Sequence, residues 1–265
     1  MNKFYIGVDL EGVACAVGIP GEGMGNGANY AFAAREALRE ANACARALFD
    51  GGADEVIVWD NHGSGVNLDY DEVDPRCRIA LGSGFHTRFP GIDGSFGGVL
   101  FIGYHAREGT GRAVLAHTYN SRVYQRYAVN GQEMGEMDID AAYAGEHGVP
   151  VLFCASDAAC VAQAKERFPW AETVVTKEGW GWNAAVSLHP REAQKRIYEG
   201  VRRAMERRGE MQPYRIPGPF EFTVRFKRMD AAAQAPLYDR ERNPFACPDP
   251  FTRTGWLDRI GQVMD

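Results

Sequence analysis

Carboxylates and imidazoles follow three short apolar segments of this chain, at spacings that suit metal binding. The segments, each with the side chains that follow it, are FYIGV at 4–8 with Asp9 and Glu11, EVIVW at 55–59 with Asp60 and His62, and GVLFIGY at 98–104 with His105. Residues two apart on an extended chain point to the same side. Two carboxylates held in this way repel each other unless a cation compensates them or one keeps a proton.

The mixture of ligand types indicates which metal would bind. Carboxylates combined with imidazoles suit Zn²⁺ or Mn²⁺ better than Ca²⁺, which prefers oxygen ligands alone. Each residue by itself has an ordinary structural explanation, because a lone Asp at a strand end is often a turn or cap residue. The residues alone therefore leave both a metal site and a structural role open.

Two further residues have chemistry that suits such a site. His117 follows the small apolar run AVLA, and it would serve there as a general base or nucleophile, or else be an exposed loop histidine. Glu136 is expected in the first turn of a helix, where an acidic side chain is favourable in any case. Their positions in the sequence do not decide between these roles.

The elements that must position these side chains follow an α/β pattern. The three apolar segments are rich in β-branched and aromatic residues, which predicts buried strands. Further predicted strands cover 149–156, 173–177 and 220–226, and predicted helices cover 29–49, 136–146, 157–168 and a basic segment from 190. This order predicts a three-layer α/β core with a mostly parallel sheet. Ligands of such sheets bind beyond the carboxyl ends of the strands, so we expect the three strand ends to form one site.

A break in composition near 212–219 predicts the domain organisation. We expect a metal-binding α/β catalytic domain over 1–211, and a smaller C-terminal α+β segment over 212–265 that packs on it or on a neighbouring subunit. The tail from 228 is expected to be irregular, with a short helix near the end. The Gly-rich segment 18–27 predicts a loop that could close over the site, and it lacks the Lys-Ser/Thr ending of a phosphate-binding loop.

Composition excludes several classes of protein. The net charge of −6 argues against a nucleic-acid partner, which requires a basic surface. No apolar stretch approaches the roughly 20 residues that span a bilayer, and the N-terminal residues do not resemble a signal peptide, which predicts a cytoplasmic protein. None of the six cysteines forms a C-x-x-C pair, so we expect reduced cysteines, mostly in the core.

Five motifs together resemble one known family, the D-aminopeptidases of the zinc metallopeptidases. The motifs, which cover about residues 3–205 in order, are VDLEG at 8–12, DNH at 60–62, GYHAR at 103–107, AHT at 116–118 and NG…GE at 130–136. The resemblance implies a hydrolase with two zinc ions per chain, with manganese as an alternative. It implies short peptide or aminoacyl amide substrates that carry N-terminal D-residues, and a homo-oligomer, of which a ring-like decamer is one form.

The resemblance also implies roles for individual residues. Asp9 would bridge the two ions, and His117 would be the catalytic residue beside them. The remaining implied metal ligands are Glu11, His62, His105 and Glu136. Asp60 is then left with a positioning role behind the ligands.

The sequence departs from the family pattern at two positions. Gly7 stands where members commonly have Ser, and Trp182 stands where they commonly have Arg. The pair Trp180 and Trp182 would either pack in the core or form an aromatic wall of the substrate pocket, and core packing is slightly favoured.

Other functions remain open at this stage. One alternative is a metal-dependent amidohydrolase that acts on another small substrate. A second is a phosphoesterase, for which Arg107 is the only obvious residue to bind the phosphate group. A third is a metal-binding oligomeric scaffold, which would leave no open coordination position.

Overall fold

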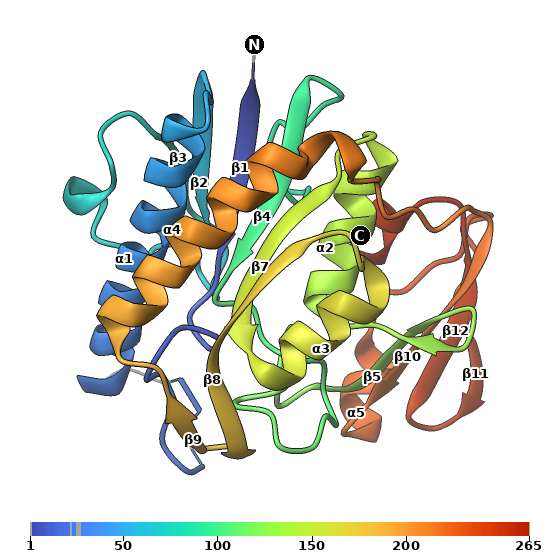
Figure 1. Cartoon of the computed structure of the whole chain (residues 1–265). Coiled ribbons are helices and arrows are strands. Elements are labelled where there is room, and N and C mark those ends of the chain that lie inside the picture. The colour runs from blue at the N-terminus through green and yellow to red at the C-terminus, as the bar shows by residue number, and fades with distance from the viewer. Residues whose placement is uncertain (1, 22, 25–27, 265) are drawn as a thin grey trace.

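The computed structural model has a three-layer α/β core with a second, smaller sheet beside it (Figure 1), and it describes residues 2–21, 23, 24 and 28–264. In spatial order, the described strands of the main sheet are β3 (Arg78–Ala80), β2 (Glu55–Asp60), β1 (Lys3–Val8), β4 (Phe96–Ile102), β7 (Val151–Asp157), β8 (Glu172–Gly181) and β9 (Ala184–Ser187). All neighbouring pairs are parallel except β8 and β9. The predicted fold class is confirmed.

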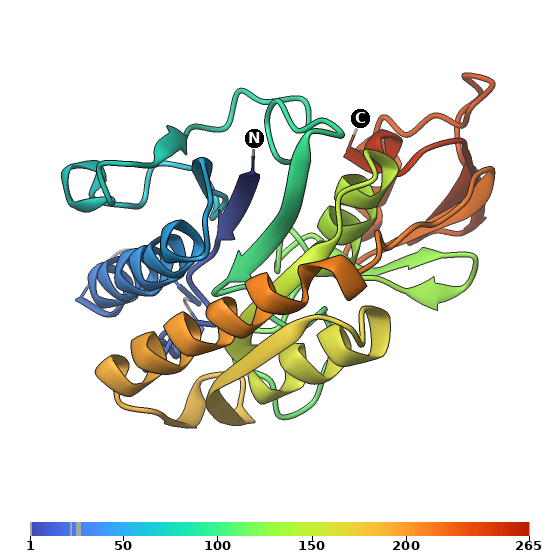
Figure 2. The same ribbon diagram turned by 45° about the horizontal axis from the view of Figure 1, so that its top comes forward.

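Helices cover both faces of the main sheet. The long helices α1 (Ala28–Asp50) and α4 (Pro190–Arg207) lie side by side on one face, as Figures 1 and 2 show. The shorter helices α2 (Glu136–Glu146) and α3 (Ala158–Arg167) pack on the other face. Short 3₁₀ helices are formed by Tyr70–Glu72 and Arg208–Glu210. No helix among the described residues is both long and apolar enough to cross a membrane.

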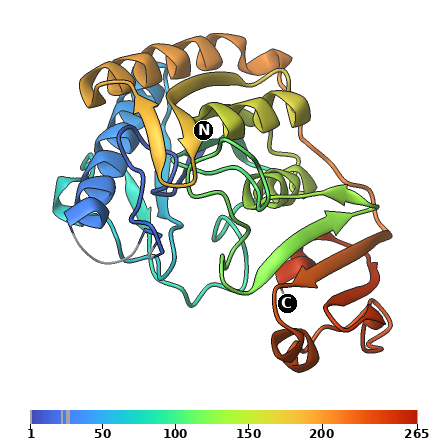
Figure 3. The same ribbon diagram turned by 90° about the horizontal axis from the view of Figure 1, so that it is seen from below.

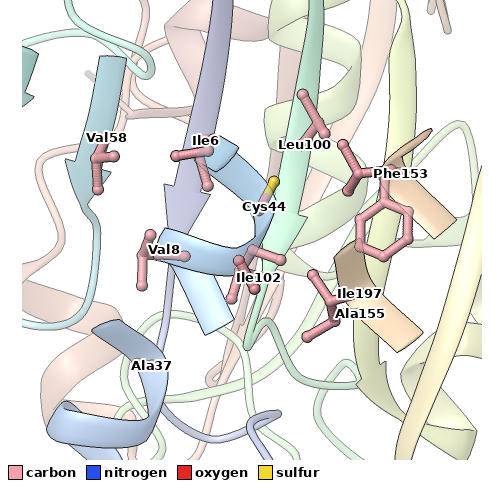
Figure 4. Packing of buried hydrophobic residues seen from close by; sticks show 14 of the residues in the cluster. Ile6, Val8, Ala37, Cys44, Val58, Leu100, Ile102, Phe153, Ala155 and Ile197 are labelled. Carbon is pink, nitrogen blue, oxygen red and sulfur yellow. The ribbon is translucent and has the colours of Figure 1, made fainter. Parts of the chain in front are cut away.

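Burial on both faces explains the continuous apolar runs in the sequence. Alternate residues of β1 point to opposite faces, so Ile6 and Val8 contact the α1/α4 layer while Tyr5 contacts the opposite layer. Figure 4 shows this packing, in which small α1 residues such as Ala37 and Cys44 lie against the strands. Packing on both faces therefore fixes the end of each strand. The loop residues that follow start from a rigid position.

The second sheet is antiparallel and lies to one side of the core (Figure 2). Its described strands, in spatial order, are β11 (Ala246–Asp249), β12 (Thr252–Leu257), β10 (Phe220–Phe226), β5 (Tyr124–Val129) and β6 (Gln132–Glu133). The predicted turn at Asn130-Gly131 joins β5 to β6, and both residues have positive φ angles of 49° and 77°. Such a pair of angles is typical of a two-residue hairpin turn.

The expectation of an irregular tail after residue 228 is wrong. This region forms α5 (Met229–Gln234), β11 and β12, before the predicted terminal helix appears as a 3₁₀ turn at Ile260–Met264. Backbone pairing with β10 creates β12, and this long-range pairing leaves little periodicity in the sequence. Because β5 and β6 precede residue 212, strands from both sides of the predicted domain boundary share this sheet. The division at 212 stays a prediction.

The order of the strands reverses between β1 and β4. From β1 the chain proceeds outward to β2 and β3, whereas from β4 it proceeds in the opposite direction to β7 and β8. Ligands of such sheets bind beyond the carboxyl ends of the strands at this switch point. Figure 3 views the molecule from this edge. Part of the Gly-rich segment 18–27 lies outside the described residues, so its predicted closure is not described.

Candidate metal centre

The five residues implied as metal ligands lie together beyond the carboxyl ends of β1, β2 and β4. Nδ1 of His62 lies 2.8 Å from Oδ1 of Asp9 and 3.2 Å from Oε2 of Glu11. Nε2 of His105 lies 3.6 Å from Oδ2 of Asp9 and 3.2 Å from Oε1 of Glu136. Asp9 therefore faces one histidine with each of its oxygens. The two histidines and Glu136 come from different elements of the fold.

Close contact between two loops brings these side chains together. The amide of Asp9 donates to the Ile102 carbonyl over 2.8 Å, which continues the pairing of β1 and β4 past the strand ends. Gly103 has a φ of +73°, and a Cβ atom there would lie 2.0 Å from the carbonyl oxygen of Asp9. Only glycine allows this approach, which explains the first residue of the GYHAR motif. Glu136 comes from the first turn of α2, and its Oε1 accepts a 2.6 Å bond from the Tyr119 amide.

Burial and close spacing shift the pKa values of the two carboxylates of the cluster in opposite directions. Burial and the neighbouring Glu11 raise the pKa of Asp9 to about 7. Burial also opposes ionisation of Glu11, but the attraction of His62 outweighs it and holds the pKa of Glu11 well below its ordinary value. At neutral pH the two carboxylates can therefore be accommodated only with protons or positive charge beside them. This agrees with the behaviour expected for two acids spaced two residues apart.

The donor atoms form two overlapping sets. Ligand atoms of Asp9, Glu11 and His105 all lie within 4.8 Å of one another, and so do those of His105, His117 and Glu136. His62 adds a nitrogen close to the first set. Carboxylate oxygens and imidazole nitrogens at this spacing fit zinc. His117 also lies within ligand range, so its geometry permits metal binding as well as catalysis.

Backbone carbonyls fix the orientation of two histidines. Nδ1 of His117 lies 2.7 Å from the Leu115 carbonyl, and Nδ1 of His105 lies 3.1 Å from the Ala106 carbonyl. Because a carbonyl only accepts, each Nδ1 carries a hydrogen, and Nε2 is the nitrogen that holds the lone pair when the ring is neutral. Burial opposes protonation of His105, but the neighbouring Glu136 outweighs it and raises the pKa of His105 to about 10. The two rings stack with centroids 3.9 Å apart. Histidine ligands of metals usually have such a partner on the second nitrogen.

His117 is held in its neutral form. Burial and the neighbouring His105 lower its pKa below the ordinary value. Its Nε2 lies 3.8 Å from Oε1 of Glu136, at the side of the cluster that faces a cavity. A neutral imidazole with a free lone pair can accept a proton in this position.

Asp60 does not contact the cluster directly but organises the loop that carries His62. Its carboxylate accepts bonds from the amides of Asn67 and Leu68 and from the Tyr70 hydroxyl. The Asn67 side chain in turn donates to Asp60 and to the carbonyl of His62. This arrangement supports the positioning role expected of Asp60.

Two buried ionisable side chains that the sequence did not indicate, Lys177 and Glu40, hold the turn after Glu11. Nζ of Lys177, on β8, donates to the carbonyls of Glu11, Val13 and Ala16, the last two over 2.8 and 2.5 Å. Oε1 of Glu40, on α1, accepts a 2.9 Å bond from the amide of Ala14. A lysine within a predicted apolar strand was the only signal in the sequence for this support.

The buried Glu40 should make stability depend on pH. Burial raises its folded pKa to about 8, from an ordinary value of 4.5. Between these values the unfolded chain releases the proton while the folded protein keeps it, so stability falls as pH rises through this window. The loss amounts to about 1.4 kcal/mol for each pKa unit separating the two states.

Glu40→Gln tests this assignment, because an amide oxygen can still accept from Ala14 but cannot ionise. We expect the variant to lose less stability than the parent between pH 5 and pH 9, measured by urea unfolding. Parallel pH profiles for the two proteins would show that Glu40 ionises without cost.

The Gly7 departure has a steric explanation. A Cβ atom on Gly7 would lie 2.7 Å from the hydroxyl of Tyr104, which fills the space where family members commonly carry a serine side chain. That hydroxyl donates to Asp140 over 2.6 Å and accepts from Asn61, and Arg88 pairs with the same Asp140. The phenol belongs to a buried network and cannot shift freely.

Gly7→Ala should therefore destabilise the protein by about 1–3 kcal/mol, the usual cost of overpacking a core. In a Tyr104→Phe background the same substitution should cost less, because the closest atom is gone. Urea unfolding of the four proteins in this double-mutant cycle measures the difference. An equal cost in both backgrounds would rule out the contact as the cause.

The cluster opens into a cavity of about 350 Å³ whose lining includes Glu11, His62, His117, Arg122 and Trp182. Trp180 is 63% exposed and Trp182 is 37% exposed, so the favoured expectation that they pack in the core is wrong. Trp180 is the next-to-last residue of β8, and its exposed ring lies beneath the guanidinium group of Arg112. Trp182 follows the strand and forms part of the cavity wall.

Arg107 does not serve the cluster. Its Nε lies 3.4 Å from Glu133, and the residue lines a separate cavity with Arg126 and Arg225. The cationic group that a phosphoesterase would require at the metals is therefore not supplied by Arg107.

A doubly wound α/β sheet with buried carboxylates and imidazoles at its switch point defines a metal-binding α/β protein whose cluster is open to a substrate. The D-aminopeptidase family model, peptidase M55, matches residues 2–243, and the chain belongs to this family. It is therefore a hydrolase that acts on peptide bonds.

Two relatives agree with this assignment. A D-aminopeptidase of Bacillus subtilis (strain 168) is 29% identical over 238 residues, which cover 89% of this chain and 85% of the relative. The solved structure of the Zn-dependent D-aminopeptidase DppA from Bacillus subtilis, described as a self-compartmentalizing protease, is similar with a TM-score of 0.90. That match has 25% identity and covers 99% of this chain and 94% of DppA.

Proposed function

We propose that this chain is a di-zinc D-aminopeptidase, which removes the N-terminal residue from short peptides or aminoacyl amides. The observation that carries the proposal is the convergence of five buried or half-buried donors, in which His62 contacts Asp9 and Glu11 and His105 contacts Asp9 and Glu136. Asp9 would bridge the ions, since its two oxygens face His62 and His105 separately. The other ligands would be Glu11, His62, His105 and Glu136. The zinc dependence of the similar DppA structure supports zinc as the metal.

The chemistry of the donor set fits zinc. Buried acids with histidine neighbours require compensation by positive charge, and two zinc ions would replace the shared protons. Bound there, zinc would polarise the peptide carbonyl and lower the pKa of a water molecule. Manganese accepts the same ligand types and is the alternative.

His117 is the residue that we propose to move the proton. Its free Nε2 would accept a proton from the attacking nucleophile and deliver it to the nitrogen of the departing amine. The Leu115 carbonyl would stabilise the positive charge that forms on the ring, through the 2.7 Å bond at Nδ1. Stacking on His105 prevents the ring from turning away between the two transfers.

The alternative functions differ in how well the site supports them. Hydrolysis of another small amide would use the same residues and differ only in the cavity. A phosphoesterase is less well supported, because Arg107 faces away from the cluster. A closed metal scaffold disagrees with a cluster whose His62 and His117 line a cavity.

Assembly is a further part of the proposal. The description of DppA as self-compartmentalizing supports a homo-oligomer, with a ring-like decamer as one form. Exposed apolar residues of the C-terminal segment, Met229, Tyr238 and Trp256, are suited to a subunit interface. We also keep the expectation of a cytoplasmic protein that binds neither nucleic acid nor membrane.

A panel of matched substrates tests the proposed function. The zinc-loaded protein would be incubated with D- and L-aminoacyl amides, D- and L-dipeptides and phosphoesters. We expect release of the N-terminal residue, faster for the D-forms. Turnover of phosphoesters alone would reject the peptidase assignment for this site.

A further inference from the structure

A second cavity continues from the cavity of the metal centre. It has a volume of about 450 Å³, within the range usual for ligand sites. The linings of both cavities include Gly23, Ser121, Arg122 and Trp182, so these residues form a neck between them. An aminopeptidase holds one residue on the amino side of the cleaved bond, and everything else must lie beyond it. The second cavity offers the space for that leaving part.

The charges of the second cavity favour an anion at the neck. Glu108 and Lys227 pair over 2.9 Å and largely cancel each other. Arg122 forms no ion pair with any of the described residues, and it lines both cavities. A substrate with a negative end would therefore be oriented with that end at Arg122.

The backbone ties Arg122 to the catalytic residue. Arg122 lies five positions after His117, and its amide donates to Oδ1 of Asn120 over 3.0 Å. Lys227 holds the carbonyl of Ser121 over 2.7 Å, which anchors the same segment from β10's end of the second sheet. These hydrogen bonds fix the backbone between His117 and Arg122, and they therefore fix the distance between the two residues.

Trp182 completes the neck as an apolar wall. Its Nε1 donates to the Ala116 carbonyl over 3.0 Å, and its own carbonyl accepts from the Leu115 amide over 2.9 Å. These bonds fix the indole on the residues just before His117. The ring can therefore contact an apolar side chain of the leaving residue without reordering.

We propose that Arg122 binds the C-terminal carboxylate of a dipeptide substrate, with the leaving residue in the second cavity against Trp182. This inference rests on the proposed peptidase function and names its preferred substrate class. A guanidinium group binds a carboxylate through two parallel hydrogen bonds, and a carboxamide cannot replace that charge. The enzyme should then prefer a dipeptide with a free carboxylate to the same dipeptide with a C-terminal amide.

Substitution of Arg122 tests the substrate preference. For Arg122→Gln we expect KM for the dipeptide to rise about 10- to 100-fold with kcat nearly unchanged, and no comparable change for the dipeptide amide. Arg122→Lys should recover part of the loss, because it keeps the charge without the fork. Arg126→Gln is the matched control, since Arg126 pairs with Glu133 and lines neither of these two cavities. Equal losses for both substrates, or the same loss in the control, would overturn the assignment.

A binding measurement separates this inference from the proposed function. The probes are a dipeptide whose amide is replaced by CH₂–NH, which cannot be hydrolysed, and the same compound with a C-terminal carboxamide. Calorimetry with the zinc-loaded protein should show tighter binding of the carboxylate form, and Arg122→Gln should abolish the difference. Lack of hydrolysis with this preference intact would reject only the peptidase function. Equal binding of the two probes by the parent protein would reject the role of Arg122.

Discussion

His117→Ala is expected to lower kcat by about 10²–10⁴-fold while the zinc content stays unchanged, the usual contribution of a positioned acid–base group. The Leu115 carbonyl fixes the tautomer of His117, and burial beside His105 keeps its ring neutral. The side chain can thus accept a proton. It is not one of the two histidines that contact Asp9, which are His62 and His105. Steady-state rates and elemental analysis of the same sample give the two readouts.

A matched histidine substitution provides the control. His86→Ala removes an exposed histidine that borders a different cavity and should leave both readouts unchanged. His117 also lies within ligand range of His105 and Glu136, so the opposite outcome has a clear meaning. Parallel loss of zinc and hydrolysis in His117→Ala would make His117 a metal ligand.

His62→Ala is expected to weaken zinc binding by more than the roughly 10–100-fold that follows loss of an outer partner of a metal ligand, with hydrolysis lost in parallel. Its Nδ1 is the nitrogen nearest to both Asp9 and Glu11. Without the ring, the nitrogen beside the first donor set is lost, and the buried carboxylates of Asp9 and Glu11 lose their compensating neighbour. Titration of the metal-free protein with zinc measures the change.

Asp60→Asn should weaken zinc binding less than His62→Ala does, and it serves as the comparison. Asp60 contacts the loop that carries His62 rather than the donor atoms, so its loss should weaken zinc binding by about 10–100-fold and no more. Zinc affinity and hydrolysis that persist in His62→Ala would remove His62 from the site. A larger effect for Asp60→Asn than for His62→Ala would reverse the two assigned roles.

The sequence predicted the core of the site because the relevant residues directly follow strands. Asp9, Asp60 and His62 come within three residues of a strand end, and parallel strands must place such residues at one edge. Glu136 could not be reached by this argument. It arrives through the β5–β6 hairpin and α2, and only the resemblance to a family assigned it to the metals.

The residues that support the site were harder to predict. Lys177 contacts carbonyl oxygens more than 160 positions away in the sequence, and no local pattern encodes such a contact. The sequence shows only that glycine replaces serine at position 7. The structure explains the glycine by the hydroxyl of Tyr104, which follows a different strand and occupies the space beside it. Arg122 became informative only when two cavities were seen to meet beside it. Long-range packing decides each of these cases.

The central claim is a pair of zinc ions held by Asp9, Glu11, His62, His105 and Glu136, and metal dependence of hydrolysis tests it most directly. Protein purified without chelator would be analysed for zinc and assayed on a D-aminoacyl amide, then assayed again after chelation and after zinc is returned. We predict about two zinc ions per chain, loss of hydrolysis on chelation and recovery with zinc. Undiminished hydrolysis by the metal-free protein would contradict the account.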